Sequence, residues 1–562
     1  MSIVMPLDEA VRRCVRPGMS LHFGAAWAFP NAALFEVIRR FAGREPGFTL
    51  ILSTGGATSA APFLAAGLAR RVISSFLGDG YPNPGPNPTI QHSINSGRVV
   101  VESWTMLTLT LRLLAGALDL PALPTRSILG SSLEDDLRGL FRCLPSPFNP
   151  TETLGLVSPL RPDLNFTHGW AADAEGNTLL PVPLASNAFG ALAAKDGAIV
   201  TVEKIVSPEV IRAHSYMARI PAHGVRAVCE VPFGAHPLGC LGLGLPDGDG
   251  YREDRAFILE ARAAARTDTS QADWIRRWIL DCPDHEAYLA HLGPERIAAL
   301  QDFSPVPQRP RSPTTRPSPT PSEVMIAGAA REIDSAVRER GYQSILAGIG
   351  ASHLAAWLAE ADLRADGVSV NLLAEVGTVG FQPLPGDPFL FALQNVTTAS
   401  LTSDILTVLG MLVTRKSEPC LGVLGAAQVD RRGNLNTTRL PNGDFLMGSG
   451  GANDVASGAA EVIVVARQSR GRFVERVAHV TSPGERVSTL VTQLGVYRKV
   501  DGGFRLTGVF APQSELGRAV QAAREACGWE LQVAPEVEAL PLPTADERLQ
   551  MRSFDPVGDL WN

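Results

Sequence analysis

The stretch Ser344-Ile-Leu-Ala-Gly-Ile-Gly350, followed by His353-Leu-Ala-Ala-Trp-Leu-Ala-Glu-Ala361, decides the fold. Its apolar run predicts a buried strand, its glycines predict a turn, and the next run predicts a helix. The same order occurs upstream, where Met19-Ser-Leu-His-Phe-Gly24 precedes a helical run that starts at Asn31. Strands that alternate with helices are typical of mostly parallel sheets covered by helices. Both halves of the chain are therefore predicted to be α/β.

A second pattern occurs in both halves. Asp173-Ala-Glu-Gly-Asn177 and Asp430-Arg-Arg-Gly-Asn434 share Asp-x-x-Gly-Asn, and each precedes an apolar strand candidate, 198–202 or 462–466. One such motif is an ordinary tight turn, because Asp caps its own backbone and Gly or Asn accepts positive φ. Its recurrence in the same order indicates an internal duplication. We expect two related open α/β domains that face one another.

The boundary between the two domains is predicted at a proline-rich segment. Residues 304–322 contain seven prolines and almost no apolar side chains, so they should form an extended tether. The predicted organisation is a first domain at 1–303, a linker at 304–323 and a second domain at 324–562. The length of 562 residues agrees with more than one domain, since a single core stops growing near about 250–300 residues.

The composition excludes several classes of function. The chain is 45% hydrophobic and 19% charged with a net charge of −7, and it has no basic stripe, so nucleic-acid and membrane partners are disfavoured. Seven scattered cysteines without a Cys-x-x-Cys pair resemble buried thiols in a reducing compartment. No apolar run reaches the length of a membrane span and the N-terminus shows no signal-peptide pattern, so we expect a cytoplasmic protein. The ten histidines are dispersed, and no metal is predicted.

The chemistry is expected near Glu375. This residue comes at the end of the strand candidate that starts with Val368-Ser-Val-Asn-Leu-Leu373, and it is followed by Gly377 and Gly380. Open α/β sheets bind ligands at the carboxyl ends of their strands, and glycines let a substrate approach the backbone closely. A glutamate at a strand end is, taken alone, more often a cap or a solvated edge. The neighbouring glycine turns favour a functional role.

Four motifs in sequence resemble class I coenzyme A transferases. Ala374-Glu-Val-Gly-Thr-Val-Gly380 resembles the Glu-x-Gly-x-x-Gly segment that carries the family's nucleophilic glutamate, and Ala347-Gly-Ile-Gly350 resembles the upstream glycine turn. Residues 425–436 resemble the Gly-Ala-x-Gln-Val-x-x-x-Gly-Asn stretch, and 448–454 resemble the Gly-Gly-Ala-x-Asp loop. The first half is similar to the α subunit of the glutaconate branch, with both subunits fused in one chain.

The resemblance implies a ping-pong transfer of coenzyme A from an acyl-CoA to a carboxylic acid. Glu375 would attack the thioester, form a mixed anhydride and then carry CoA as a glutamyl thioester. Backbone amides that hold the oxyanion are expected at Gly24, Ala25, Gly450 and Gly451. CoA is expected to contact eight positions: Gly348, Gly350, Gly377, Gly380, Gly425, Gln428, Asn434 and Ala452. The partners implied are acyl-CoA, a carboxylate acceptor and further copies of the chain in a homodimer or larger homo-oligomer.

Two alternatives remain open. Some glutaconate-type relatives hydrolyse a β-diketone or open a ring in a CoA thioester, with the working carboxylate at the position that Glu102 matches; Glu102 would then be a general base. From the residues alone Glu102 could equally be a buried structural acid paired with Arg112 or Arg126.

A non-catalytic acyl-CoA-binding protein is the other alternative, and it would keep the glycine loops without needing Glu375. The loop Gly24-Ala-Ala-Trp27 departs from the family's open Gly-Gly pair by adding bulk.

Overall fold

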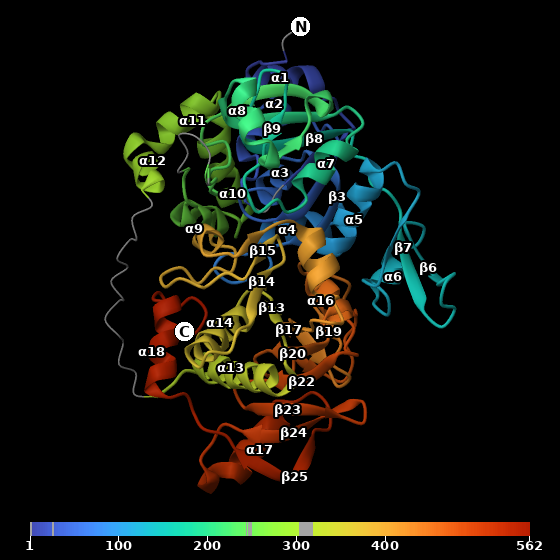
Figure 1. Ribbon diagram of the computed structural model, residues 1–562, viewed down its shortest axis with the longest axis vertical. Helices are drawn as coiled ribbons and strands as arrows, with labels where there is room; N and C mark the ends of the chain where they lie inside the picture. The colour runs from blue at the N-terminus through green and yellow to red at the C-terminus, as the bar shows by residue number, and fades with distance from the viewer. Residues whose placement is uncertain (1–2, 25–26, 243, 245–249, 303–317) are drawn as a thin grey trace.

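Two large sheets, one in each half, form the framework of the molecule. The computed structural model describes residues 3–24, 27–242, 244, 250–302 and 318–562. Figure 1 shows the first half (blue to green) stacked on the second (yellow to red) along the longest axis. The protein is α/β with mostly parallel sheets, as the sequence predicts.

The first sheet contains nine strands within the described residues, in the path β11-β9-β8-β1-β2-β3-β4, with β10 between β8 and β12. All its neighbours are parallel except β8–β9 and β9–β11. Its strands are β1 Ser20–Phe23, β2 Phe48–Gly55, β3 Ala69–Leu77, β4 Val100–Ser103, β8 Leu164–Ala172, β9 Thr178–Leu179, β10 Ala198–Ile205, β11 Ala218–Ile220 and β12 Val225–Glu230.

The second sheet contains ten strands within the described residues, in the order β16-β15-β14-β13-β17-β20-β22-β23-β24-β25. Its centre, from β14 to β22, is parallel. Antiparallel pairs extend it on both sides, through β15 and β16 and through β23 and β24, and the edge strand β25 pairs parallel with β24. Its strands are β13 Ser344–Ala347, β14 Asn371–Ala374, β15 Thr378–Val379, β16 Leu401–Thr402, β17 Cys420–Leu424, β20 Glu461–Val465, β22 Val487–Val491, β23 Gly495–Val500, β24 Gly503–Val509 and β25 Gln532–Ala539.

Two small sheets complete the strands that the structure describes. The order β5-β7-β6 forms an arm that projects from the first half in Figure 1, and β19-β18-β21 lies in the second half. Their strands are β5 Leu123–Thr125, β6 Phe141–Pro145, β7 Thr153–Val157, β18 Gln428–Asp430, β19 Leu435–Asn436 and β21 Phe473–Val474.

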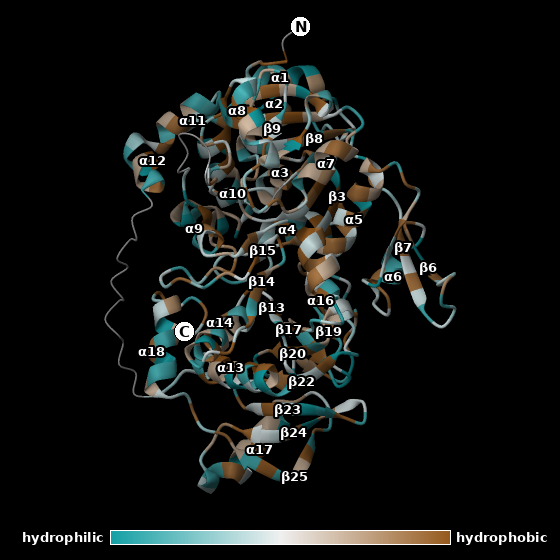
Figure 2. Cartoon of the chain, in the orientation of Figure 1, coloured by the Kyte–Doolittle hydropathy of each residue, from teal (hydrophilic) through white to brown (hydrophobic). Residues whose placement is uncertain are grey.

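Helices cover the sheets and enclose the hydrophobic cores. Figure 2 shows hydrophobic residues along the central strands and hydrophilic residues on outer helices such as α18. The α-helices of the first half are α1 Leu7–Cys14, α2 Asn31–Phe41, α3 Ala60–Ala65, α4 Pro88–Asn95, α5 Met106–Ala117, α6 Leu133–Asp136, α7 Asn187–Ala193, α8 Pro208–Ala213, α9 Arg255–Ala264, α10 Asp268–Ile275, α11 His285–Leu292 and α12 Pro294–Gln301. Those of the second half are α13 Pro321–Arg340, α14 Ala351–Ala365, α15 Leu393–Thr397, α16 Ala452–Gly458, α17 Leu516–Glu525 and α18 Ala545–Phe554.

The two Asp-x-x-Gly-Asn segments form the same turn. The Asp173 carboxylate accepts hydrogen bonds from the backbone and side chain of Asn177, and Asp430 does the same for Asn434. Each aspartate also donates its own N–H to the carbonyl of that asparagine, at 3.1 Å in both cases. This identical bonding, in turns that each join an antiparallel strand pair, β8–β9 or β18–β19, supports the duplication that the motif predicts.

The end of the predicted linker differs from the observed helix start. The sequence interpretation places 321–323 in the tether, but α13 already begins at Pro321. Thr320 and Glu323 form a capping box, and proline is well tolerated in the first helical turn. Most of the predicted linker lies outside the described residues, and the division into domains stays a prediction. Among the helices that the structure describes, none has the length and apolarity needed to cross a membrane.

Candidate active site

Glu375 lies in a tight turn at the contact between the two halves. The turn joins β14 to β15, which pair antiparallel, so the carboxylate follows directly from a strand held in the sheet. The neighbouring Val376 carbonyl accepts a hydrogen bond from the Ala185 amide of the first half at 3.2 Å. The predicted position at a strand end is therefore observed, and residues from both halves fix the turn.

The Glu375 carboxylate is partly buried and has no hydrogen-bond partner among the residues that the structure describes. Gly451 packs against it, since a Cβ at that position would lie 1.8 Å from Glu375 Oε2. Burial, reinforced by the nearby Asp454 carboxylate, raises the pKa of Glu375 to about 8. Because no donor among the described residues stabilises its charge, the ionised form of this carboxyl group is a more basic nucleophile than one bonded to the protein.

The raised pKa predicts a pH dependence of stability. Because the ordinary pKa of glutamate is 4.5, the unfolded chain loses this proton first as pH rises. The stability that the protonated Glu375 contributes is therefore present below pH 4.5 and lost as pH approaches 8. We expect Glu375→Gln to stabilise the protein by roughly 1–3 kcal/mol at pH 8.5 and by much less at pH 5. Urea unfolding at the two pH values measures this, and an equal gain at both would contradict it.

Asp454 connects the glycine loop of the second half to helix α5 of the first. Its carboxylate accepts from Thr105 Oγ1 at 2.6 Å and from the Leu107 amide at 3.0 Å, so it caps the start of α5. Burial raises the pKa of Asp454 to about 6 despite these bonds. The adjoining Met106 amide donates to the Gly450 carbonyl at 2.9 Å. These bonds hold the loop beside Glu375.

The amides predicted to hold an oxyanion are not equally available. Gly24 N–H donates to the Phe166 carbonyl at 3.0 Å, and Gly450 N–H donates to the Ser75 carbonyl at 2.9 Å. Neither can bind an oxyanion without breaking its bond. Ala25 lies outside the described residues. Gly451 N–H has no acceptor within the described parts of the chain, so it is the predicted donor that remains free beside Glu375.

The glycines after Glu375 are explained by backbone packing. Gly377 has φ +124°, and a Cβ there would lie 2.2 Å from the Ser403 carbonyl oxygen. Gly380 has φ +64°, and a Cβ there would lie 2.2 Å from Ser400 Oγ. Both therefore admit the neighbouring 400–403 segment, whereas the sequence interpretation assigned this space to a substrate.

The other positions expected to contact CoA are turns and element ends in the second half. Gly348 and Gly350 lie between β13 and α14, Gly425 follows β17, and Ala452 starts α16. Asn434 is occupied within the tight turn on Asp430, and Gln428 bonds to Asn436 and the Gly471 carbonyl. A CoA contact at these positions stays a prediction.

Glu102 lies in a closed polar network on edge strand β4. Its oxygens bond to Arg71, to Arg112 at 2.7 Å and to the indole N–H of Trp104 at 2.7 Å. The side chain is only 7% exposed. This arrangement favours the structural alternative, with Arg112 as the partner that the sequence proposed, joined by Arg71.

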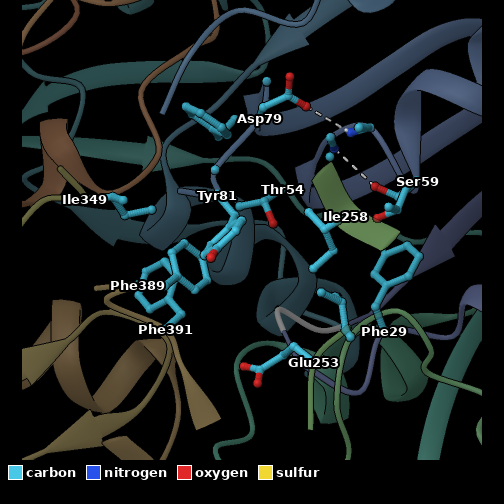
Figure 3. A pocket seen from close by; sticks show the side chains of 18 of the residues that line it. Phe29, Thr54, Ser59, Asp79, Tyr81, Glu253, Ile258, Ile349, Phe389 and Phe391 are labelled. Carbon is cyan, nitrogen blue, oxygen red and sulfur yellow. Dashed lines mark hydrogen bonds between the residues drawn. The ribbon is translucent and has the colours of Figure 1, made fainter. Parts of the chain in front are cut away.

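A large pocket opens beside the turn of Glu375 (Figure 3). Its cavity volume is about 160 Å³, and Val376 and Met106 line it near the turn. Much of the remaining wall is aromatic and comes from both halves, including Trp27, Tyr81 and Phe391. Glu375 itself is not a lining residue, so the pocket adjoins it through Val376 and could hold an apolar group beside the turn.

The described residues also include one group with metal-ligand atoms within 4.8 Å of one another, namely His168, Glu203 and Cys240. His168 bonds through Nδ1 to Thr201 and through Nε2 to Glu203. Glu203 accepts further bonds from Tyr251 and the Phe233 amide. Because hydrogen bonds occupy both imidazole nitrogens, this group is explained as a buried network.

Comparison with protein families places this chain in a known class. The model of the family "Coenzyme A transferase" matches residues 4–230 and 410–503, which is more than half of the chain. The chain belongs to the coenzyme A transferase family. The matched ranges include the glycine loop at 448–454 and the strands β1 to β4 of the first half, so the family match spans both sides of the contact.

Named transferases are similar to parts of this chain, and one solved structure is similar to nearly all of it. One chain of the glutaconate CoA-transferase of Acidaminococcus fermentans is 27% identical over 54% of this chain and 95% of its own length. One chain of the 3-oxoadipate CoA-transferase of Pseudomonas knackmussii is 29% identical over 42% of this chain and 92% of its own length. The crystal structure of the acyl-CoA transferase YdiF from Escherichia coli O157:H7 covers 98% of this chain and 97% of its own, with 16% identity and a TM-score of 0.66.

A hydrolase is also among the relatives. The cholesterol ring-cleaving hydrolase IpdA subunit of Mycobacterium tuberculosis is 27% identical over 52% of this chain and 98% of its own length. Relatives of this chain therefore carry more than one activity, so the choice between them depends on the geometry of its site.

Sequence reasoning missed part of the site. Asp454 was visible as the last residue of the Gly-Gly-Ala-x-Asp motif of this family, yet its bonds to Thr105 and Leu107 depend on the other half. The pocket wall formed by Tyr81, Phe389 and Phe391 had no sequence signal, because its residues come from segments about 300 positions apart.

Proposed function

We propose that this protein transfers coenzyme A between an acyl-CoA and a carboxylic acid, with Glu375 as the nucleophile. The Glu375 carboxylate attacks the thioester carbonyl and expels the CoA thiolate, which leaves a mixed anhydride. The thiolate then attacks the glutamyl carbonyl and releases the first acid. An acceptor carboxylate takes the CoA from the glutamyl thioester by the reverse steps. The resting Glu375 is regenerated, so atoms balance over the cycle.

One observation carries the proposal: the partly buried Glu375 carboxyl group has no hydrogen-bond partner among the described residues and lies next to the free amide of Gly451. The free amide can donate to the oxyanion that forms when the thioester is attacked, where it contributes more than it would in water. The raised pKa makes Glu375 a more basic nucleophile than an exposed glutamate once it is ionised. Similarity to two named CoA-transferases supports the same reaction class.

Hydrolysis of a CoA thioester or of a carbon–carbon bond within its acyl group is the second candidate, favoured by the similarity to the IpdA subunit. It requires Glu102 to act as a base. The bonds of Glu102 to Arg71, Arg112 and Trp104 argue against this role, because a base must present a free oxygen to its substrate. A non-catalytic acyl-CoA-binding protein would leave the position of Glu375 without an explanation.

Intact-mass measurement tests the proposal. With an acyl-CoA donor and no acceptor, the protein should gain the mass of CoA, and the adduct should map to the peptide that contains Glu375. Borohydride should reduce the glutamyl thioester to an alcohol. Glu102→Gln is the matched control, since it alters a buried carboxylate of the other half, and it should keep the adduct while losing about 1–3 kcal/mol of stability. Consumption of the thioester by water, lost in Glu102→Gln and without any adduct, would favour the hydrolase.

A further inference from the structure

The pocket beside Glu375 is placed to receive the part of the substrate next to the reacting carbonyl. Val376, whose backbone continues from Glu375, lines the pocket. Met106 lines it as well, and its amide bonds to the carbonyl of Gly450, the residue before Gly451. Glu375 and Gly451 do not line the pocket themselves, so a thioester carbonyl attacked by Glu375 would lie at the edge of the pocket, with its acyl group inside.

The pocket has an aromatic wall, defined here as Trp27, Tyr81, Phe389 and Phe391. Their rings contact in series, with centroids 5.7 Å apart for Trp27–Phe391, 5.7 Å for Phe389–Phe391 and 5.5 Å for Tyr81–Phe389. The indole N–H of Trp27 donates to the Phe391 carbonyl, so its one polar atom is satisfied. Figure 3 shows Tyr81, Phe389 and Phe391 clustered together, with Ile258 elsewhere on the wall. The wall offers ring faces and edges that suit an apolar ring.

The charged residues of the pocket are already paired. Arg255 forms ion pairs with Asp387 at 2.6 Å and Glu253 at 3.4 Å, and it stacks over Tyr81 at 4.4 Å. Arg262 lies 3.5 Å from Asp79 and donates to the Tyr81 carbonyl at 2.6 Å. Among the described lining residues, these two arginines are the cations, and acidic partners balance both. A second carboxylate on the substrate would enter a dry pocket without an uncommitted cation, which is costly.

We propose that this pocket binds the acyl group of the donor, and that this acyl group is apolar, ring-bearing and without a second carboxylate. The inference rests on the proposed transfer at Glu375 and extends it to the class of substrate. The cavity volume of about 160 Å³ agrees with a single ring, since an apolar cavity of roughly 150 Å³ can hold benzene. The bulk of Trp27, which departs from the open loop of the family, becomes a part of the wall that selects this substrate.

Adduct formation with matched donors tests the substrate class. The probes are benzoyl-CoA and cyclohexanecarboxyl-CoA, compared with acetyl-CoA and glutaryl-CoA, and the readout is the rate at which the protein gains CoA mass. The ring-bearing donors should react at least about tenfold faster at subsaturating concentration, a difference of one decade in affinity or reactivity. Equal or faster reaction of glutaryl-CoA or acetyl-CoA would overturn the inference while leaving the transfer at Glu375 intact.

Acyl-CoA binding to the Glu375→Gln protein tests the pocket without the transfer reaction, because this variant cannot form the adduct. Calorimetric titration should give ring-bearing acyl-CoAs at least about tenfold lower Kd than glutaryl-CoA, whether or not the wild-type protein forms an adduct. A binding preference without an adduct would refute the transfer but support the pocket. Equal affinities would refute the pocket.

Two phenylalanine variants test whether the aromatic wall causes the preference for ring-bearing acyl-CoAs. Phe391→Leu should weaken binding of benzoyl-CoA about fivefold or more and leave acetyl-CoA within about twofold, because the wall loses a ring but the backbone carbonyl that accepts from Trp27 remains. Phe381→Leu, a buried phenylalanine of the same segment outside this pocket, is the control and should change neither. The same loss in both variants would show a general effect on folding and contradict the assignment to the wall.

Discussion

Glu375→Gln is expected to lose the CoA adduct and at least about a hundredfold of the transfer rate, which corresponds to roughly 3 kcal/mol of transition-state stabilisation. An amide has nearly the shape of the carboxyl group but can neither attack a thioester nor form the anhydride. The fold should survive the change, because no hydrogen bond among the described residues depends on the Glu375 carboxylate.

The loss must appear in kcat as well as in kcat/KM, since the removed group acts in the chemical step and not in the binding of CoA. The acyl-CoA panel with acetate as acceptor measures the rate, and intact mass measures the adduct. Glu102→Gln provides the comparison, because it removes a charge from the other half without touching the turn at 375–377. A Glu375→Gln protein that retains more than a tenth of the rate, or that forms the adduct elsewhere, would show that another carboxylate is the nucleophile.

The elements that the sequence predicted well are those decided by local patterns. Strand β13 and helix α14 follow from an apolar run, two glycines and an amphipathic run, and the two Asp-x-x-Gly-Asn turns follow from the bonding of one aspartate to its own backbone. The position of Glu375 at a strand end belongs to the same class. Each of these depends on residues within about fifteen positions of one another.

The features that the sequence did not reveal depend on contacts between distant segments. Gly24 and Gly450 were expected to offer free amides, but the carbonyls of Phe166 and Ser75 occupy them, and both acceptors lie on other strands. Gly377 must be glycine because the Ser403 carbonyl approaches its backbone, and no local sequence pattern predicts that contact. The aromatic wall likewise requires the two halves to meet before Trp27 and Phe391 are neighbours. Local sequence patterns predict turns and strand ends. Whether a backbone amide is free, and which side chains form the wall of a pocket, depends on tertiary packing.

Gly451 provides the second test with a large expected effect. A Cβ at this position would lie 1.8 Å from Glu375 Oε2 and 2.9 Å from its Cδ, so a methyl group and the carboxylate cannot both occupy their places. Since Gly451 has no positive φ that a side chain would strain, alanine is compatible with the backbone here. Gly451→Ala should therefore fold normally and push the carboxylate away from its attacking position.

We expect Gly451→Ala to lower kcat about a hundredfold, because displacement of a reacting group by about 1 Å commonly costs that much. Gly503→Ala is the matched control: Gly503 begins strand β24 of the second sheet, and its new Cβ would meet nothing closer than the Arg431 carbonyl oxygen at 3.9 Å, an ordinary contact. That variant should keep its rate within about threefold. Thermal unfolding checks that both proteins are folded, and intact mass reports the adduct. If Gly451→Ala is as active as Gly503→Ala, the carboxylate of Glu375 does not react from the position beside Gly451, and the oxyanion donor must then be sought in another loop of the contact between the halves.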